Sequence, residues 1–209
     1  MNKLFLYRLT YCFAFISAFF ILACNPSEDP PDYKPNIYIY PTKPIRLDVK
    51  VSFPKGGRIT TSIPEYRSGW NVSVDTQGVI DKKYTYLFYE SVQPDVWQKQ
   101  SGWVVKKENL KSFFLRNMKE YGFSDAEIKD FIDYWIPRFK DYPFFAIYPQ
   151  TNERVDKVIH LDFSLSPDRI LRLHYLIKAE KSGERKLQTP HIVPFARQGF
   201  FVAEWGVIL

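Results

Sequence analysis

The stretch IRLDVKVSF, from Ile45 to Phe53, alternates apolar and polar side chains without a break. Successive side chains of a β-strand point to opposite faces, so its apolar residues, Ile45, Leu47, Val49, Val51 and Phe53, lie together on one face. We therefore expect a half-buried strand with one face on a core and the other toward solvent. Such strands are typical of antiparallel sheets.

The sequence on either side of this stretch predicts further strands. Lys55-Gly56-Gly57 has turn chemistry, and residues 58–63 are expected to return as the second strand of a hairpin. Other short strands are expected at 37–40, 70–74, 79–81, 84–90, 103–105, 144–148, 155–163, 170–178 and, as one or two strands, 192–205. Strands at this spacing predict an antiparallel sandwich or a curled sheet.

The periodicity becomes helical in one region only, at about 109–139. Apolar residues recur at helical spacing from Asn109 to Tyr121, and Gly122 follows as the expected C-cap. Ser124 and Glu127 form a capping-box pattern that opens a second helix, which should end near Pro137. The predicted fold class is therefore α+β, with an antiparallel β sheet or sandwich and one helical hairpin packed against it.

The N-terminal residues resemble a bacterial lipoprotein signal. Lys3 and Arg8 precede an apolar run that ends in Ile21-Leu22-Ala23-Cys24, which is similar to a lipobox. The resemblance implies that residues 1–23 are a cleaved signal peptide and that Cys24 is lipidated, so that the protein is held on a lipid bilayer through acylated Cys24. The alternative is an uncleaved signal anchor in which Cys24 is incidental.

Residues 24–36 are rich in proline and acids, a composition that favours an extended chain. We expect a tether here, followed by a single domain at 37–209. The predicted location is the cell envelope, and the outer membrane if the source is Gram-negative. Acids just after a lipidated cysteine resemble export signals of surface lipoproteins in some Gram-negative bacteria, but a plain solvated linker has the same composition.

Composition excludes several classes of function. Loss of residues 1–23 from the 209-residue chain lowers the formal net charge from +6 to +4, and the remaining basic residues are interleaved with acids. We therefore expect no nucleic-acid partner. Cys12 lies in the signal and Cys24 would carry lipid, so the mature domain has no disulfide, thiol nucleophile or cysteine-bound zinc. Known phosphate, zinc, calcium and serine-hydrolase motifs are absent, and we expect no cofactor.

Six further motifs resemble a family of exported bacterial domains without an established activity. They are KPNIYIYP at 34–41, PEYRSGWNV at 64–72, YLFYE at 86–90, FIDYWIPR at 131–138, SPDRILR at 166–172 and PFARQGFFVAEWG at 194–206. They span nearly the whole mature chain. Val207 stands where relatives tend to have a second glycine. The resemblance implies a shared fold and compartment, and no reaction.

Glu90 and Glu204 are the candidate catalytic residues. Each ends a strongly apolar, aromatic stretch, and apolar surroundings raise the pKa of a carboxyl group. Two carboxylates about 5–10 Å apart are what glycoside hydrolysis requires. The alternative is that each glutamate is paired with an arginine, Arg197 or Arg172, or lies at a solvated strand end.

Two other sets of residues could bind a ligand. His160, His174 and His191 could join Asp162 in a metal site, but their spacing is not that of metal ligands, so we expect no metal and solvent-exposed histidines. Aromatic residues could form a stacking platform for sugars or peptides. The candidate binding residues are Arg67 and Trp70, in a turn-rich segment and expected to be exposed, together with Arg197 and Trp205.

The favoured hypothesis is a non-catalytic envelope lipoprotein whose aromatic surface binds an envelope glycan or a partner protein. The anchor, the tether and the missing catalytic motifs support it. The alternative hypothesis is a hydrolase of envelope glycan or peptide that uses Glu90 and Glu204 as a carboxylate pair.

Overall fold

The computed structural model describes residues 31–209, with side chains from Lys34 onward. The strands are β1 Pro31–Tyr40, β2 Ile45–Ser52, β3 Arg58–Ile63, β4 Trp70–Val74, β5 Leu87–Val92, β6 Trp103–Lys106, β7 Phe144–Thr151, β8 His160–Phe163, β9 Arg169–Glu180 and β10 Phe201–Ile208. The helices are α1 Leu110–Tyr121, α2 Asp125–Trp135 and α3 Asn152–Asp156, with short 3-10 turns at Lys107–Asn109 and Ile136–Arg138. No helix among these residues is long and apolar enough to cross a bilayer.

The strands form two sheets. A seven-stranded sheet has the order β3-β5-β1-β10-β9-β7-β6, and a three-stranded sheet has the order β4-β2-β8. Neighbouring strands are antiparallel except β9 and β10, which run parallel. The predicted α+β class, with a mainly antiparallel sheet arrangement and a packed helical hairpin, is confirmed.

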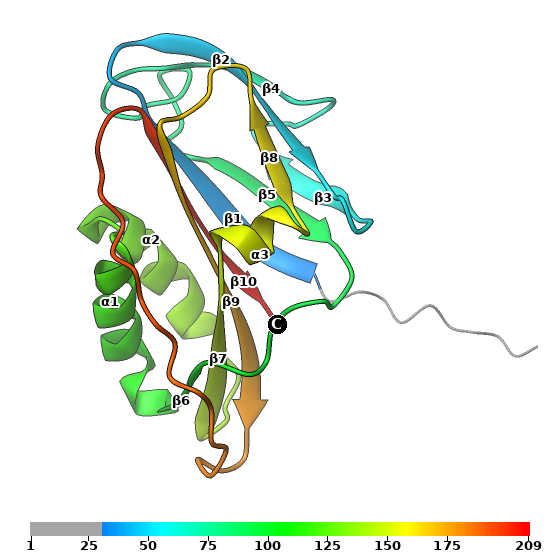
Figure 1. Ribbon diagram of the computed structural model, residues 1–209, viewed down its shortest axis with the longest axis vertical. Coiled ribbons are helices and arrows are strands. Elements are labelled where there is room, and N and C mark those ends of the chain that lie inside the picture. The colour runs from blue at the N-terminus through cyan, green and yellow to red at the C-terminus, as the bar shows by residue number, and fades with distance from the viewer. Residues whose placement is uncertain (1–30) are drawn as a thin grey trace, which may run out of the picture.

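The large sheet is the middle of three layers (Figure 1), because each of its faces has a hydrophobic core. Ile37, Ile39 and Leu87 face the small sheet and pack with Leu47, Val49 and Val72 from that sheet. The opposite face carries Tyr38, Leu173 and Trp205, which pack against Phe114 and Phe131 of the helical hairpin. Strands of the large sheet are therefore buried on both sides.

The IRLDVKVSF stretch is the central strand of the small sheet, β2. Leu47 and Val49 are at most 1% exposed, and the polar residues between the apolar ones face solvent, as the alternation predicts. The expected hairpin with residues 58–63 is wrong, because β2 pairs with β4 and β8 whereas β3 pairs with β5 in the other sheet. Gly57, at φ +141°, lets the chain cross between sheets, since a Cβ there would lie 2.5 Å from the Val92 carbonyl oxygen.

The helical hairpin has the predicted termini. Gly122 is the left-handed C-cap of α1. The Ser124 hydroxyl accepts from the Glu127 amide, and the Glu127 carboxylate accepts from the Ser124 amide, so the predicted capping box is confirmed.

Other boundaries differ from those expected. β1 begins at Pro31, so residues 31–36, expected in the tether, are a strand that pairs with β10 and β5. Val155 lies in α3, and the strand after it begins only at His160. Residues 79–81 make only two isolated bridges, both at Ile80, and 192–200 cross the helical hairpin as irregular chain. The predicted signal peptide, Cys24 and the first part of the predicted tether lie outside the described residues.

Candidate functional site

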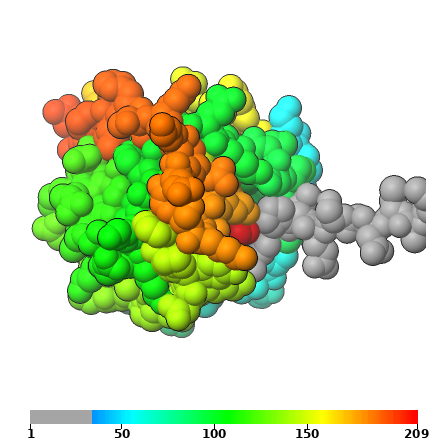
Figure 2. Space-filling view, turned by 90° about the horizontal axis from the view of Figure 1, so that it is seen from below, coloured from blue at the N-terminus to red at the C-terminus, as the bar shows by residue number. Residues whose placement is uncertain are grey.

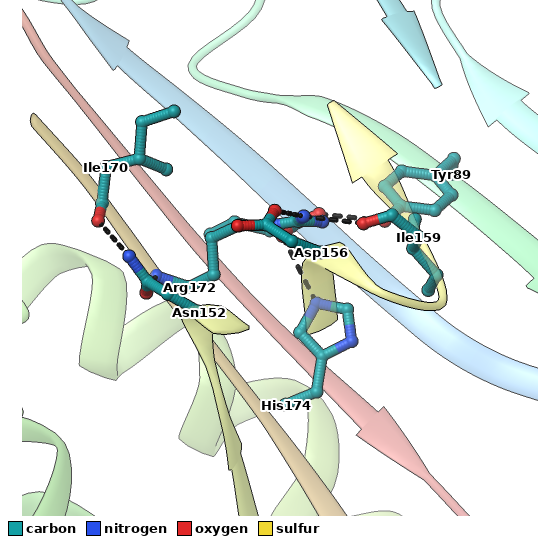
Figure 3. A network of polar contacts seen from close by, with 8 residues as sticks. Tyr89, Asn152, Asp156, Ile159, Ile170, Arg172 and His174 are labelled. Carbon is teal, nitrogen blue, oxygen red and sulfur yellow. Dashed lines mark hydrogen bonds and ion pairs between the residues drawn. The ribbon is translucent and has the colours of Figure 1, made fainter. Parts of the chain in front are cut away.

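Glu204 is the centre of a buried polar network. Figure 3 labels its partners Tyr89, Arg172 and His174. The Glu204 carboxylate lies 2.5 Å from Nε of Arg172 and 3.3 Å from Nε2 of His174, and it accepts a hydrogen bond of 2.8 Å from the Tyr89 hydroxyl. The Arg172 guanidinium also donates to Asp156 at 2.5 Å and to the Ile159 carbonyl at 2.6 Å. The network therefore joins β5, β9, β10 and α3.

The charged groups in this network stabilise one another in their ionised forms. Burial alone would raise the pKa of Glu204, but Arg172 and His174 outweigh it and hold that pKa well below its usual range. Burial alone would lower the pKa of Arg172. The negative charge of Glu204 is the largest opposing influence, and the net result is a raised pKa. The side chains of Glu204 and Arg172 are 0% and 1% exposed, so no substrate reaches them in this conformation. A carboxylate held ionised and enclosed in this way stabilises the fold and is unsuited to act as a general acid.

Glu90 lies on the other face of the sheet from Glu204. Tyr89 and Glu90 are consecutive in β5, so their side chains point to opposite faces, and Tyr89 is the one that contacts Glu204. Glu90 is half-buried near the sheet edge, where it is paired in register with Thr61 of β3. The two carboxylates are thus not brought together on one face, and the pair needed for hydrolysis is not formed.

Arg67 and Trp70 do not form the expected exposed pair. Trp70 is 2% exposed, and its indole N–H donates to the Pro64 carbonyl at 2.8 Å while its ring packs edge-on against Tyr66. Arg67 is exposed, has a φ of +47° and pairs with Glu65. The prediction failed for Trp70 because alternation in β4 turns its ring toward the core between the sheets.

Arg197 holds the irregular segment 192–200 onto the helical hairpin. Its guanidinium donates twice to the buried carboxylate of Glu127, at 2.9 Å each, and lies 4.6 Å from the centre of the Phe201 ring. The Tyr40 hydroxyl donates to the same carboxylate at 2.6 Å. Arg197 therefore has a structural role, but its partner is Glu127. Of the arginine pairings considered from the sequence, the structure has that of Glu204 with Arg172.

The histidines are dispersed. His160 and His191 are exposed, as expected, but His174 is fully buried, which the sequence did not predict. His174 and Arg172 lie on the same face of β9, toward the small sheet. That face is covered by other residues and does not meet solvent, so both side chains are buried. Within residues 34–209, no three His, Cys, Asp or Glu side chains are grouped as metal ligands.

Lys34 forms a second cluster, on the helix side of the sheet, that the sequence did not reveal. A bulge between Tyr33 and Asn36 interrupts the pairing of β1, and Lys34 has a φ of +51° there. Bulges and positive φ values at non-glycine residues often direct a side chain into a functional site. Here they place the ammonium 4.3 Å from the centre of the Tyr134 ring, 5.4 Å from that of Tyr86 and 5.8 Å from that of Trp205.

The ammonium of Lys34 is only partly solvated. Burial, the largest influence, lowers its pKa, Asp130 acts in the opposite direction and Arg138 lowers it further. Asp130 is positioned by the Tyr38 hydroxyl, which donates to it at 2.9 Å. An amine that is partly desolvated over aromatic faces interacts more strongly with an anion than an exposed lysine does.

A hollow of about 370 Å³ opens beside Lys34, and we call it the tyrosine hollow. Its lining residues are Lys34, Ile63, Lys83, Tyr84, Thr85, Tyr86, Phe88 and Tyr134. Tyr84, Tyr86 and Tyr134 are half-buried, so part of each side chain is accessible to solvent. The lining contains two lysines and no carboxylate. Chemically it can stack on a ring and attract an anion, and it contains no acid-base pair.

Comparisons of the chain with family models, with curated proteins and with solved structures found no match. The resemblance carried by the six motifs thus stays a prediction. Trp205 was predicted to bind ligand, but its ring is fully buried, and it reaches the site only by supporting Lys34. The one sequence signal for the tyrosine hollow was the density of aromatic residues at 84–88.

Proposed function

We propose that this protein is an envelope lipoprotein, held on a membrane by acylated Cys24, whose domain binds an acidic glycan in the tyrosine hollow. The supporting observation is the lining itself. Three half-exposed tyrosines surround two lysines, with no carboxylate among the lining residues. Tyrosine rings stack on the apolar faces of sugars, and lysine supplies the counter-charge for a carboxylate or phosphate group.

A non-catalytic role is favoured over hydrolysis. Glu204 is ion-paired and inaccessible, and Glu90 lies on the opposite face of the same sheet. Hydrolysis of a glycosidic bond needs two carboxyl groups across one bond. The hydrolase hypothesis therefore has no specific support.

The anchor is tested by metabolic labelling with a palmitate analogue. Wild-type protein should become labelled, and Cys24→Ala should abolish the label because the thioether and acyl groups are attached at that residue. Labelling that persists in Cys24→Ala would remove the anchor from the proposal.

The binding site is tested on an array of acidic and neutral envelope glycans. Tyr86→Ala should weaken binding of every retained glycan by about tenfold, as expected for an aromatic residue at the centre of a contact. Tyr142→Ala, which removes a half-buried tyrosine outside the hollow, is the matched control and should bind normally. Equal binding by both variants, or capture of an envelope protein with no glycan binding, would overturn the proposal.

A further inference from the structure

A second, more apolar hollow of about 550 Å³ lies next to the tyrosine hollow, with Tyr134 as a shared wall. We call it the basal hollow, and its residues include Arg138, Phe139, Lys140, Phe145, Ile177 and Leu209. Phe139, Phe145 and Ile177 are at most 8% exposed, so they form a floor that opens between α2 and the ends of β7 and β9. An apolar floor of this kind suits a hydrocarbon chain.

The charge around the basal hollow is of one sign. Arg138 and Lys140 are exposed at its rim, and no Asp or Glu is among the lining residues. Neither cation takes part in a salt bridge with any residue in the described part of the chain. Arg138 is positioned by its hydrogen bond of 2.6 Å to the Tyr134 carbonyl and by its stacking on the Tyr134 ring. One positioned cation, Arg138, and two further lysines of the lining, Lys140 and Lys178, stand above an apolar floor, and together they match a ligand with an anionic head and an apolar tail.

The basal hollow also lies close to where the chain enters the domain. Asp32, near the start of β1, is paired in register with Ile208, and the next residue, Leu209, lines the hollow. Figure 2 looks onto this end of the molecule and shows the red C-terminal residues at the surface beside the orange segment that follows β9. Pro31 is seven positions after Cys24 in the chain. A fully extended chain of that length spans at most about 25 Å, so an anchor at Cys24 keeps this end near the bilayer.

We infer that the basal hollow binds an anionic lipid of the membrane to which the protein is anchored, with an acyl chain on Phe139, Phe145 and Ile177 and the headgroup between Arg138 and Lys140. This inference rests on the proposed anchor, because the anchor is what brings this end of the domain to the bilayer. It assigns the ligand of a hollow different from the one proposed to bind glycan.

The test uses the mature chain, residues 24–209, with Cys24→Ala, so that neither the signal peptide nor an attached lipid contributes, and dihexanoyl phosphatidylglycerol as the probe in calorimetric titrations. Saturable one-to-one binding is expected. Dihexanoyl phosphatidylcholine, which lacks the net charge, and inorganic phosphate, which lacks the tail, should bind at least tenfold more weakly. Equal binding of either control probe would overturn the inference, because head and tail would then not be recognised together.

Two variants separate the hollow from general attraction to an anionic surface. Arg138→Gln combined with Lys140→Gln should weaken binding by about twentyfold, since each cation near an anionic lipid contributes roughly fivefold. The matched double variant Lys43→Gln with Arg116→Gln, at exposed positions outside the hollow, should bind like the parent chain. Ala179 faces the hollow in register with Phe145, so Ala179→Trp should fill it and abolish binding while the circular dichroism spectrum stays unchanged.

Undiminished binding by folded Ala179→Trp, or equal losses in the two double variants, would contradict the inference. The proposal that the tyrosine hollow binds glycan is tested independently of this lipid inference. It depends on Tyr86 and Lys34 in the tyrosine hollow, and the anchor is read from palmitate labelling of wild-type protein. Loss of glycan binding in those experiments leaves the lipid titration unaffected.

Discussion

Glu204 and Trp205 are neighbours in β10, and their side chains belong to two different kinds of region. Glu204 points toward the small sheet, where Arg172, His174 and Tyr89 enclose it. Trp205 points toward the helices, where it supports the ammonium of Lys34 beside an open hollow. Both regions contain charges in aromatic surroundings, but only the second is accessible to a ligand.

The two regions differ in the ion-pair partners of their charges and in the access of those charges to water. A charge that is fully enclosed is tolerated only when fixed groups compensate it, so its interactions are committed to the fold. The ammonium of Lys34 lies over ring faces, is attracted by Asp130 without a direct ion pair, and is still partly solvated. An anion can replace that solvent without breaking an existing ion pair. Substitutions in the two regions should therefore separate stability from binding.

The largest expected effect is that of Arg172→Ala. It leaves the carboxylate of Glu204 buried without its main counter-charge, and breaking a buried pair costs about 3–5 kcal/mol in free energy of unfolding. Urea unfolding measures it. The double variant Arg172→Met with Glu204→Leu should recover most of the loss, since no lone charge remains. A loss below about 1 kcal/mol in Arg172→Ala would contradict the structural role of the network.

A smaller effect is expected from Arg197→Gln, because Glu127 keeps the Tyr40 hydroxyl and the Ser124 amide as donors. We expect a loss of about 1–3 kcal/mol, the range for a hydrogen-bonded charged group. Arg67→Gln is the control, since its ion pair with Glu65 is exposed and should contribute nothing measurable. The midpoint of urea unfolding measures both losses. Equal midpoints for the two variants would mean that the Arg197–Glu127 pair contributes no more stability than an exposed ion pair.

The pH dependence of stability should follow the buried network. The pKa of Glu204 is depressed in the folded protein, so its contribution is present above the ordinary value of 4.5 and is lost as pH falls below that value toward the folded pKa. Wild-type protein should therefore lose more free energy of unfolding between neutral pH and acid than Glu204→Gln does. Urea unfolding at a series of pH values measures the two slopes. Parallel curves would show that Glu204 binds protons alike in both states.

The smallest effect on stability is expected at Lys34. Lys34→Gln should change the free energy of unfolding by less than about 1 kcal/mol, as is usual for a partly solvated cation over aromatic rings. The amine itself is tested by competitive acylation followed by mass spectrometry. Because burial lowers the pKa of Lys34, its reactivity should begin at lower pH than that of a lysine in an unstructured model peptide. Identical pH profiles would contradict the enclosure of Lys34 by the rings.

Patterns that act within one element were predictable from the sequence. The alternation in β2, the Gly122 cap and the Ser124–Glu127 capping box depend on residues close in the chain, and all are present. Sheet assignment was not predictable, because the hairpin expectation assumed that β2 and β3 pair, and only packing decides that they join different sheets.

The sites were less predictable than the fold, since each depends on which face of a strand is covered. Arg172 and His174 have the alternation of a solvated face, and their burial follows from a second sheet formed by distant residues. Trp70 was expected to be exposed and Trp205 to bind ligand, but both rings are buried because the strand faces that carry them are covered. Lys34 lies at a bulge, and a bulge leaves no mark in the pattern of apolar residues.

The most direct test of a binding site at Lys34 is one paired measurement of affinity and stability. Tetragalacturonate serves as an acidic glycan probe and maltotetraose as its neutral counterpart, titrated into wild-type protein, Lys34→Gln and Glu204→Gln. We predict that Lys34→Gln lowers affinity for the acidic probe by about tenfold with little change in unfolding free energy. We predict that Glu204→Gln lowers the unfolding free energy and leaves the affinity of the folded protein unchanged. The opposite pattern, with affinity lost at Glu204 and kept at Lys34, would contradict the proposed site.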